Sequence, residues 1–224
     1  MLPEPYYHDE AAGITIYCGD CRGILPYLDI EVLVMDPPYG IDYRSGRTGH
    51  HGGTSLPGIA GDTDTTLRDA VIAAIPVPSV VFGSWKVNRP DGCRMVLIWD
   101  KGDHVGMGDL SLPWKPNTEE IYVLGGGFTG HRGGSVLRFP APVTWNSVAG
   151  ARVHPHEKPA SLMREIIGKC PPGTILDPFM GSGTTLRAAK DLGRKAIGIE
   201  IEERYCEIAV RRLQQSALPL GAAA

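Results

Sequence analysis

A tetrapeptide in the first fifth of the chain could present hydrogen-bond acceptors beside an aromatic ring; it consists of Asp36, Pro37, Pro38 and Tyr39. The apolar run Val32–Met35 before it predicts a strand buried on both faces. Asp36 then stands at the carboxyl end of that strand, where α/β proteins bind ligands. Because proline has no backbone N–H, the strand cannot continue, and carbonyl groups can face a ligand together with the carboxylate. Such acceptors suit an amino group on a nucleobase stacked against Tyr39, although a simple turn capped by Asp36 would also explain the pattern.

A second segment has the pattern of a strand, a glycine-rich turn and a helix; it reads Asp177-Pro178-Phe179-Met180-Gly181-Ser182-Gly183-Thr184-Thr185. Since glycine has no Cβ, backbone amides at Gly181 and Gly183 can approach a ligand closely. Glu200 ends the next predicted strand, where a carboxylate can bind two ribose hydroxyls. The third glycine of the dinucleotide fingerprint is missing, so the segment predicts a different nucleoside-containing cofactor.

A third segment, His154-Pro155-His156-Glu157-Lys158-Pro159, stands immediately before a predicted helix. It could be no more than a polar helix entry. Only that one helix separates it from the glycine-rich turn, however. Lys158 could therefore reach an anionic group of a ligand that binds at the turn.

The elements that must position these residues alternate between short apolar strands and amphipathic helices, which predicts an α/β layered fold with a mostly parallel sheet. The predicted strands are Gly13–Tyr17, Glu31–Met35, Ser79–Phe82, Arg94–Trp99, Glu119–Leu124, Thr174–Leu176 and Lys195–Ile199. The predicted helices are Asp64–Ile75, Pro159–Lys169, Thr184–Leu192 and Glu202–Gln214. Neither a repeat nor a linker divides the sequence, so residues 1–224 are expected to form one domain.

Two stretches, Gly40–Gly61 and Gly125–Val153, lack periodicity and are predicted to be loop insertions. The net charge of the whole chain is −3, yet these stretches carry a local excess of arginine. The arginines concerned are Arg44, Arg47, Arg132, Arg138 and Arg152. Basic charge in loops suits a polyanionic partner, and ordinary solvated surface is the alternative explanation.

Composition excludes several classes of protein. No run of about 18 apolar residues is present, so we expect no membrane span. The first residues show neither a basic region nor an apolar stretch, so a secretory signal is not expected. Five cysteines without regular spacing argue against a disulfide framework and for the cytoplasm. Since Cys18 and Cys21 have no second pair, no metal site is expected.

Together these segments resemble the S-adenosylmethionine-dependent DNA amino-methyltransferases. Asp36–Tyr39 resembles their catalytic Asp-Pro-Pro-Tyr motif, and Asp177–Thr185 their cofactor motif. The order, with the catalytic motif first, is that of the permuted β group. The His154–Pro159 segment is similar to the His-Pro-Thr-Gln-Lys-Pro segment of that group and departs from it at His156 and Glu157. The resemblance covers residues 14–40, 94–124 and 137–213, and implies a three-layer Rossmann-like fold.

The resemblance also implies a role for particular residues. Those at the target base are Asp36, Pro37, Pro38 and Tyr39. Those at S-adenosylmethionine are Asp20, Lys158, Asp177, Pro178, Phe179, Gly181, Ser182, Gly183, Thr184 and Glu200. The arginines expected on DNA, from the basic charge of the two loop stretches rather than from the resemblance, are Arg44, Arg47, Arg132 and Arg138. Because relatives in this group often pair, a homodimer is one of the expected assemblies.

The favoured activity is methylation of adenine N6 in DNA, since an aspartate at the first motif position is commoner in adenine enzymes and a serine in cytosine enzymes. Cytosine N4 is the alternative, and a methyltransferase of the same fold acting on RNA or on a protein amide is a further one. Asp36 in place of asparagine argues against the protein amide. A nicotinamide-dependent dehydrogenase and a DNA-binding protein with a decayed site are alternatives from other classes, disfavoured by the missing third glycine and by the intact Asp36–Tyr39 motif.

Overall fold

A computed structural model describes residues 1–38, 64–103, 108, 110–141 and 157–215. Its strands are β1 (Tyr7–Asp9), β2 (Ile14–Cys18), β3 (Val32–Met35), β4 (Ser79–Gly83), β5 (Cys93–Asp100), β6 (Thr118–Leu124), β7 (Val136–Arg138), β8 (Ile175–Asp177) and β9 (Ala196–Glu200). Its helices are α1 (Cys21–Ile24), α2 (Thr66–Ala74), α3 (Ala160–Ile167), α4 (Thr184–Asp191) and α5 (Glu203–Gln214), with a 3₁₀ turn, η1, at Leu25–Tyr27. Every predicted strand and helix is confirmed, with ends that move by up to two residues.

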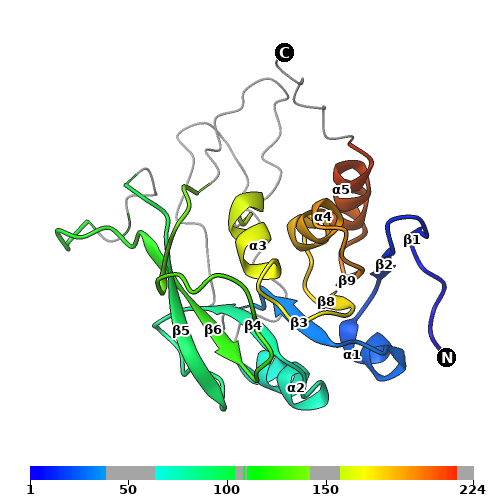
Figure 1. The fold of residues 1–224 in the computed structure, drawn as a ribbon, viewed down its shortest axis with the longest axis horizontal. Coiled ribbons are helices and arrows are strands. Elements are labelled where there is room, and N and C mark those ends of the chain that lie inside the picture. Colours follow the sequence, from blue (N-terminus) through cyan, green and yellow to red (C-terminus); the bar gives the residue numbers. More distant parts are fainter. Residues whose placement is uncertain (39–63, 104–107, 109, 142–156, 216–224) are drawn as a thin grey trace.

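All the described strands form one sheet in the order β1-β2-β9-β8-β3-β4-β6-β5-β7 (Figure 1). The strands from β2 to β4 in this order are parallel, whereas β6 is antiparallel to both β4 and β5. The mostly parallel sheet predicted from the sequence is therefore confirmed. β3 and β8 are hydrogen-bonded neighbours although they come from opposite halves of the chain.

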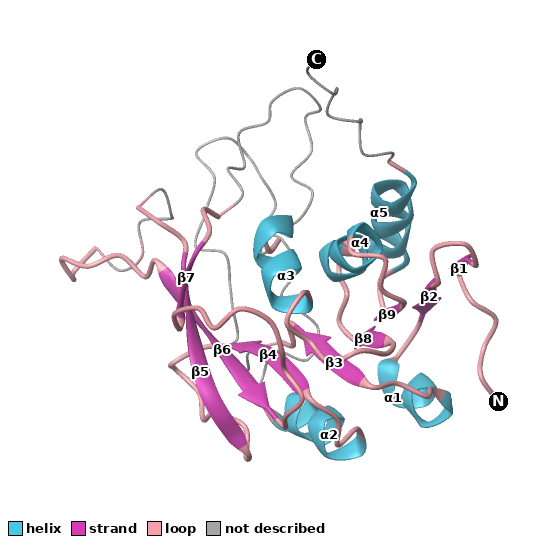
Figure 2. Cartoon of the chain, in the orientation of Figure 1, coloured by secondary structure: helices cyan, strands magenta, loops and turns pink. Residues whose placement is uncertain are grey.

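Helices cover the sheet on both faces, so the fold has three layers (Figure 2). On one face α3, α4 and α5 pack against Val32 and Val34 of β3. On the other face α1 and α2 pack against Leu33 and Met35 of the same strand. Each of these four side chains is almost fully buried, which explains why β3 is a continuous apolar run.

Short elements near the ends of the sheet were not predicted. β1 and α1 flank β2, and β7 pairs with β5 inside the stretch 125–153 that was predicted to be a loop insertion. All three residues of β8, which was predicted, are buried, whereas the three residues of β1 and of β7 are at least partly exposed, so neither forms a buried apolar run. No helix within the described parts of the chain has the length and apolar character to cross a bilayer.

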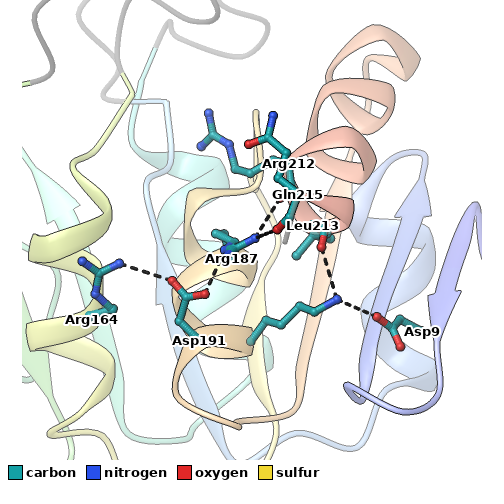
Figure 3. Close-up of polar contacts among 8 residues, drawn as sticks. Asp9, Arg164, Arg187, Asp191, Arg212, Leu213 and Gln215 are labelled. Carbon is teal, nitrogen blue, oxygen red and sulfur yellow. Dashed lines mark hydrogen bonds and ion pairs between the residues drawn. The ribbon is translucent and has the colours of Figure 1, made fainter. Parts of the chain in front are cut away.

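A polar network fixes α4 between its neighbours (Figure 3). Arg187 pairs with Asp191 and donates to the carbonyls of Arg212 and Gln215 at the end of α5. Arg164 of α3 also reaches Asp191, at 3.2 Å. These contacts hold α4 to both α3 and α5.

Candidate functional site

The carboxyl ends of neighbouring strands gather the predicted residues at one edge of the sheet. Asp36 follows β3, Asp177 ends β8 and Glu200 ends β9, and these strands lie side by side in parallel. Asp20 follows β2, which pairs with β9 through Cys18 and Glu200. The topology therefore brings the predicted catalytic and cofactor residues together from distant parts of the sequence.

The turn between β8 and α4 has the backbone that its glycines permit. Gly181 and Gly183 have φ values of +50° and +78°, a region that side chains with a Cβ disfavour. A Cβ on Gly183 would lie 2.7 Å from that of Ala209 in α5, whereas a Cβ on Gly181 would meet nothing within 4 Å. Gly183 therefore serves packing, whereas Gly181 has open space beside its Cα.

Asp177 is buried at the start of this turn. Only 3% of the residue is exposed. The Thr185 hydroxyl donates to one carboxylate oxygen, and the Phe179 N–H donates to the other at 3.1 Å. Burial raises the pKa of Asp177 to about 7, against the effect of these two hydrogen bonds. The side chain thus organises the turn from within.

Glu200 joins the turn to the end of β9. Its carboxylate accepts the Gly181 N–H at 3.0 Å and the Glu202 N–H at 2.8 Å. Burial raises the pKa of Glu200 despite these bonds. The position at the strand end suits ribose hydroxyls, and the two accepted bonds hold the carboxylate in one orientation.

The other residues predicted at the cofactor lie in the same region with different surroundings. Asp20 caps α1 and forms an ion pair with Arg22, which holds the pKa of Asp20 below its usual range. Pro178 and Ser182 are buried, and Phe179 is half-buried. Thr184 is also buried and accepts a hydrogen bond from Arg212, so the structure ties its hydroxyl to α5.

Lys158 lies beside the residue predicted to be catalytic. Its Nζ is 2.8 Å from Asp36 Oδ2 and 3.1 Å from Glu119 Oε2. The ammonium also lies over the ring of Phe82, 4.9 Å from its centroid, and over that of Trp99 at 5.7 Å. The sequence pointed to Lys158 as a cofactor residue and gave no sign of its pairing with Asp36.

Glu119 is a site residue that sequence reasoning missed. Its carboxylate contacts Lys158 and, at 2.5 Å, the Nζ of Lys101. The only available signal was its position at the start of a predicted strand. Because β6 runs antiparallel to β4, the start of β6 lies at the edge of the sheet where β4 ends. The sequence does not show this direction.

The remaining predicted residues are less fully placed. The Asp36 side chain is 28% exposed and Pro37 is buried. Tyr39, Arg44 and Arg47 lie outside the described residues. Arg132 and Arg138, which were predicted to bind DNA, are exposed, and the Arg138 guanidinium is 3.6 Å from the Asp100 carboxylate. Within the described residues, no cluster of three or more His, Cys, Asp or Glu side chains could hold a metal ion.

Comparisons with known proteins agree on one family. The family model described as "DNA methylase", of the N6/N4 type, matches residues 81–211. The chain is 30% identical to "Putative methylase YubD" of Escherichia coli (strain K12), over 92% of this chain and 93% of that protein. It is 48% identical to the type II methyltransferase M.ScaI of Streptomyces caespitosus over 69 residues, which are 30% of this chain and 23% of that protein.

A solved structure has the same fold. The crystal structure of an M1.HpyAVI–SAM complex superposes with a TM-score of 0.62 at 24% identity, covering 89% of this chain and 100% of that one. The Rossmann-like fold expected from the sequence is thereby confirmed.

Proposed function

The chain belongs to the S-adenosylmethionine-dependent DNA methylase family, and we propose that it methylates the N6 amino group of adenine in DNA. The choice of adenine rests on the aspartate at the first motif position, Asp36, and one observation carries the proposed methyl transfer to a base. Asp36 directly follows β3, Asp177 ends β8, and these two parallel strands are hydrogen-bonded neighbours. A base bound at Asp36 would therefore lie next to a cofactor bound at the turn after Asp177, so that both reactants are held close together.

Asp36 and Pro37 activate the amine in this proposal. An exocyclic amino group is a poor nucleophile because its lone pair is delocalised into the ring. The Asp36 carboxylate and the Pro37 carbonyl would accept its two N–H groups and favour a tetrahedral nitrogen with a localised lone pair. Fixed acceptors also stabilise the positive charge that develops on the nitrogen. Pro38 ends the strand, and Tyr39 would stack on the base.

The cofactor is assigned to the turn and the strand ends beside it. When bound, S-adenosylmethionine supplies an electrophilic methyl group. We assign its ribose to Glu200 and the rest of its contacts to the remaining predicted residues: Asp20, Lys158, Asp177, Pro178, Phe179, Gly181, Ser182, Gly183 and Thr184. The open space beside Gly181 supports this placement. Since Lys158 also contacts Asp36, it would stand between the cofactor and the base.

The DNA contacts rest on exposed arginines and on the need to reach the base. A base inside a duplex hides its amino group, so the target must be flipped out. We propose that Arg132 and Arg138, with Arg44 and Arg47, bind phosphates, which position the protein without reading sequence. A homodimer is proposed from the family resemblance. The five cysteines are free, which supports a reducing compartment, and we place the protein in the cytoplasm.

The test identifies the methylated nucleoside. Unmodified genomic DNA is incubated with the protein and S-adenosylmethionine, digested to nucleosides and analysed by mass spectrometry, with RNA and a glutamine-containing peptide as parallel substrates. N6-methyl-2′-deoxyadenosine is the expected product. N4-methyl-2′-deoxycytidine would overturn the adenine assignment, and methylation of RNA or peptide alone would overturn the DNA substrate.

A further inference from the structure

Glu119 reaches the catalytic edge of the sheet because of the direction of its strand. β6 is antiparallel to β4, and Glu120 pairs with Gly83 at the carboxyl end of β4. The start of β6 therefore lies at the edge where β3 and β4 end. Only 15% of the Glu119 side chain is exposed, so its charge needs partners.

Charged side chains form a chain across this edge. The Glu119 carboxylate contacts Lys101 at 2.5 Å and Lys158 at 3.1 Å, and Lys158 contacts Asp36 at 2.8 Å. The four groups alternate in sign and their formal charges balance. Trp99, whose ring lies near both lysines, is itself anchored by a 2.7 Å hydrogen bond to the Phe139 carbonyl.

We propose that Glu119 is a positioning residue: it holds the Lys158 ammonium in place, and Lys158 in turn holds the Asp36 carboxylate for the target amine. This role rests on the proposed function of Asp36. A buried ammonium group that pairs with one acid can move together with that acid. A second acid on another strand holds the ammonium group in one position. Lys101 binds the other oxygen of Glu119 and fixes that carboxylate from outside.

The charges around Lys158 give the proposal a measurable consequence. Among the described residues, Asp36 faces the Lys158 ammonium from the end of β3 and Glu119 faces it from β6, with Lys101 on the other side of Glu119. Phe82 and Trp99 contact the ammonium with their ring faces. Asp177, on β8, interacts electrostatically with Asp36. Burial disfavours the charged form of Lys158, but Asp36 and Glu119 outweigh it and raise the pKa of Lys158. Removing the charge of Glu119 should lower that pKa.

The neighbouring acid provides a matched control. Glu120 follows Glu119 in the same strand, and its side chain is 12% exposed. It binds Arg89 at 2.8 Å and the Tyr122 hydroxyl at 2.8 Å, away from Lys158. Glu119→Gln and Glu120→Gln therefore each remove one largely buried negative charge from β6, and only the first removes a partner of Lys158.

Two readouts test the proposal. In the protein without cofactor, NMR of labelled lysine side chains, with Lys158→Met to assign the signal, should show the Lys158 titration midpoint lowered by about one pH unit in Glu119→Gln and unchanged in Glu120→Gln. In methylation assays at saturating S-adenosylmethionine, the single-turnover rate should stay near wild type in Glu120→Gln and fall by about tenfold or more in Glu119→Gln. The alkaline limb of its pH–rate profile should also move to lower pH.

The outcomes separate this proposal from the proposed function. An unchanged Lys158 midpoint in Glu119→Gln, or equal rate losses in both glutamine variants, would overturn the positioning role. If the wild-type protein transfers no methyl group to DNA, the proposed function fails, and the NMR titration still decides whether Glu119 holds Lys158. Thermal melting of both glutamine variants shows whether a loss of activity comes from unfolding. If Glu119→Gln is unfolded, Glu119→Asp, which keeps the negative charge, should keep the Lys158 titration midpoint at its wild-type value. A lowered midpoint in a folded Glu119→Asp would refute the proposal.

Discussion

Replacing Asp177 by Asn should change how the stability of the protein depends on pH. The carboxylate is buried under the turn that begins α4, and burial raises its pKa to about 7 from an ordinary value of 3.8. Between these two pH values the folded state keeps a proton that the unfolded state has lost. Wild-type stability therefore falls as the pH rises through this interval, and becomes constant above it.

The magnitude follows from the size of the shift. Each pH unit is worth 1.36 kcal/mol, so the interval from 3.8 to about 7 corresponds to about 4 kcal/mol for this single group. Asparagine cannot ionise, and its side chain can still accept the Phe179 N–H and donate to the Thr185 hydroxyl. As the pH rises from 4 to 7, the free energy of unfolding of Asp177→Asn should therefore increase by up to about 4 kcal/mol relative to that of the wild type.

Urea unfolding at several pH values from 4 to 9 measures this difference. Asp9→Asn is the control, because the hydrogen bond from Lys190 lowers the pKa of Asp9. The loss of unfolding free energy in Asp9→Asn, relative to wild type, should be constant above pH 5. Above that pH the Asp9 carboxylate of the wild type is fully ionised and contributes its full stabilisation. A constant difference between Asp177→Asn and wild type over the whole range would show that Asp177 ionises normally in the folded protein.

Four further substitutions test the proposed site. Asp36→Ala should lower the methylation rate by about a hundredfold or more and leave S-adenosylmethionine binding near wild type; a variant that keeps a tenth of the activity would refute the role of Asp36. Glu200→Ala should weaken the binding of S-adenosylmethionine, measured by calorimetry, by roughly 2–4 kcal/mol and leave DNA binding unchanged. An unchanged dissociation constant for S-adenosylmethionine would exclude Glu200 from the cofactor site. Gly183→Ala should destabilise the protein by about 1–3 kcal/mol in thermal unfolding, because of its φ and the contact with Ala209. Gly181→Ala, with open space at its Cβ, should cost less; equal losses would contradict the packing argument.

The fold could be predicted from the sequence wherever burial imposes a pattern. Val32–Met35 is apolar throughout because helices cover both faces of β3. The apolar side chains of α3 repeat at helical spacing because one face of this helix packs into the core. The order of the strands could not be predicted, since it depends on pairing between segments far apart in the chain. β7 could not be predicted because its three residues, Val136–Arg138, are at least partly exposed and form no buried apolar run.

The candidate site could be predicted where backbone geometry constrains a local segment. The glycine-rich turn is recognisable because its positive φ values favour glycine, and Glu200 because it is the acid at the end of an apolar strand, β9. The Lys101–Glu119–Lys158–Asp36 chain has no such local pattern. Its members come from four segments that meet only after the sheet has formed, and each one alone is an ordinary charged residue in the sequence.

Three carboxylates at adjacent strand ends would repel one another, and the structure resolves this in two ways. Asp36 is paired with Lys158, whereas burial raises the pKa of both Asp177 and Glu200, favouring their neutral forms. S-adenosylmethionine carries positive charge on its sulfonium and amino groups. A cation bound at this edge would favour the ionised carboxylates, since an opposite charge nearby lowers the pKa of an acid. In the proposed function, the same edge therefore accommodates three acidic side chains without the cofactor and favours the binding of a positively charged one. This follows from placing the acids on neighbouring parallel strands, so it does not depend on the order in which the catalytic and cofactor motifs occur along the chain.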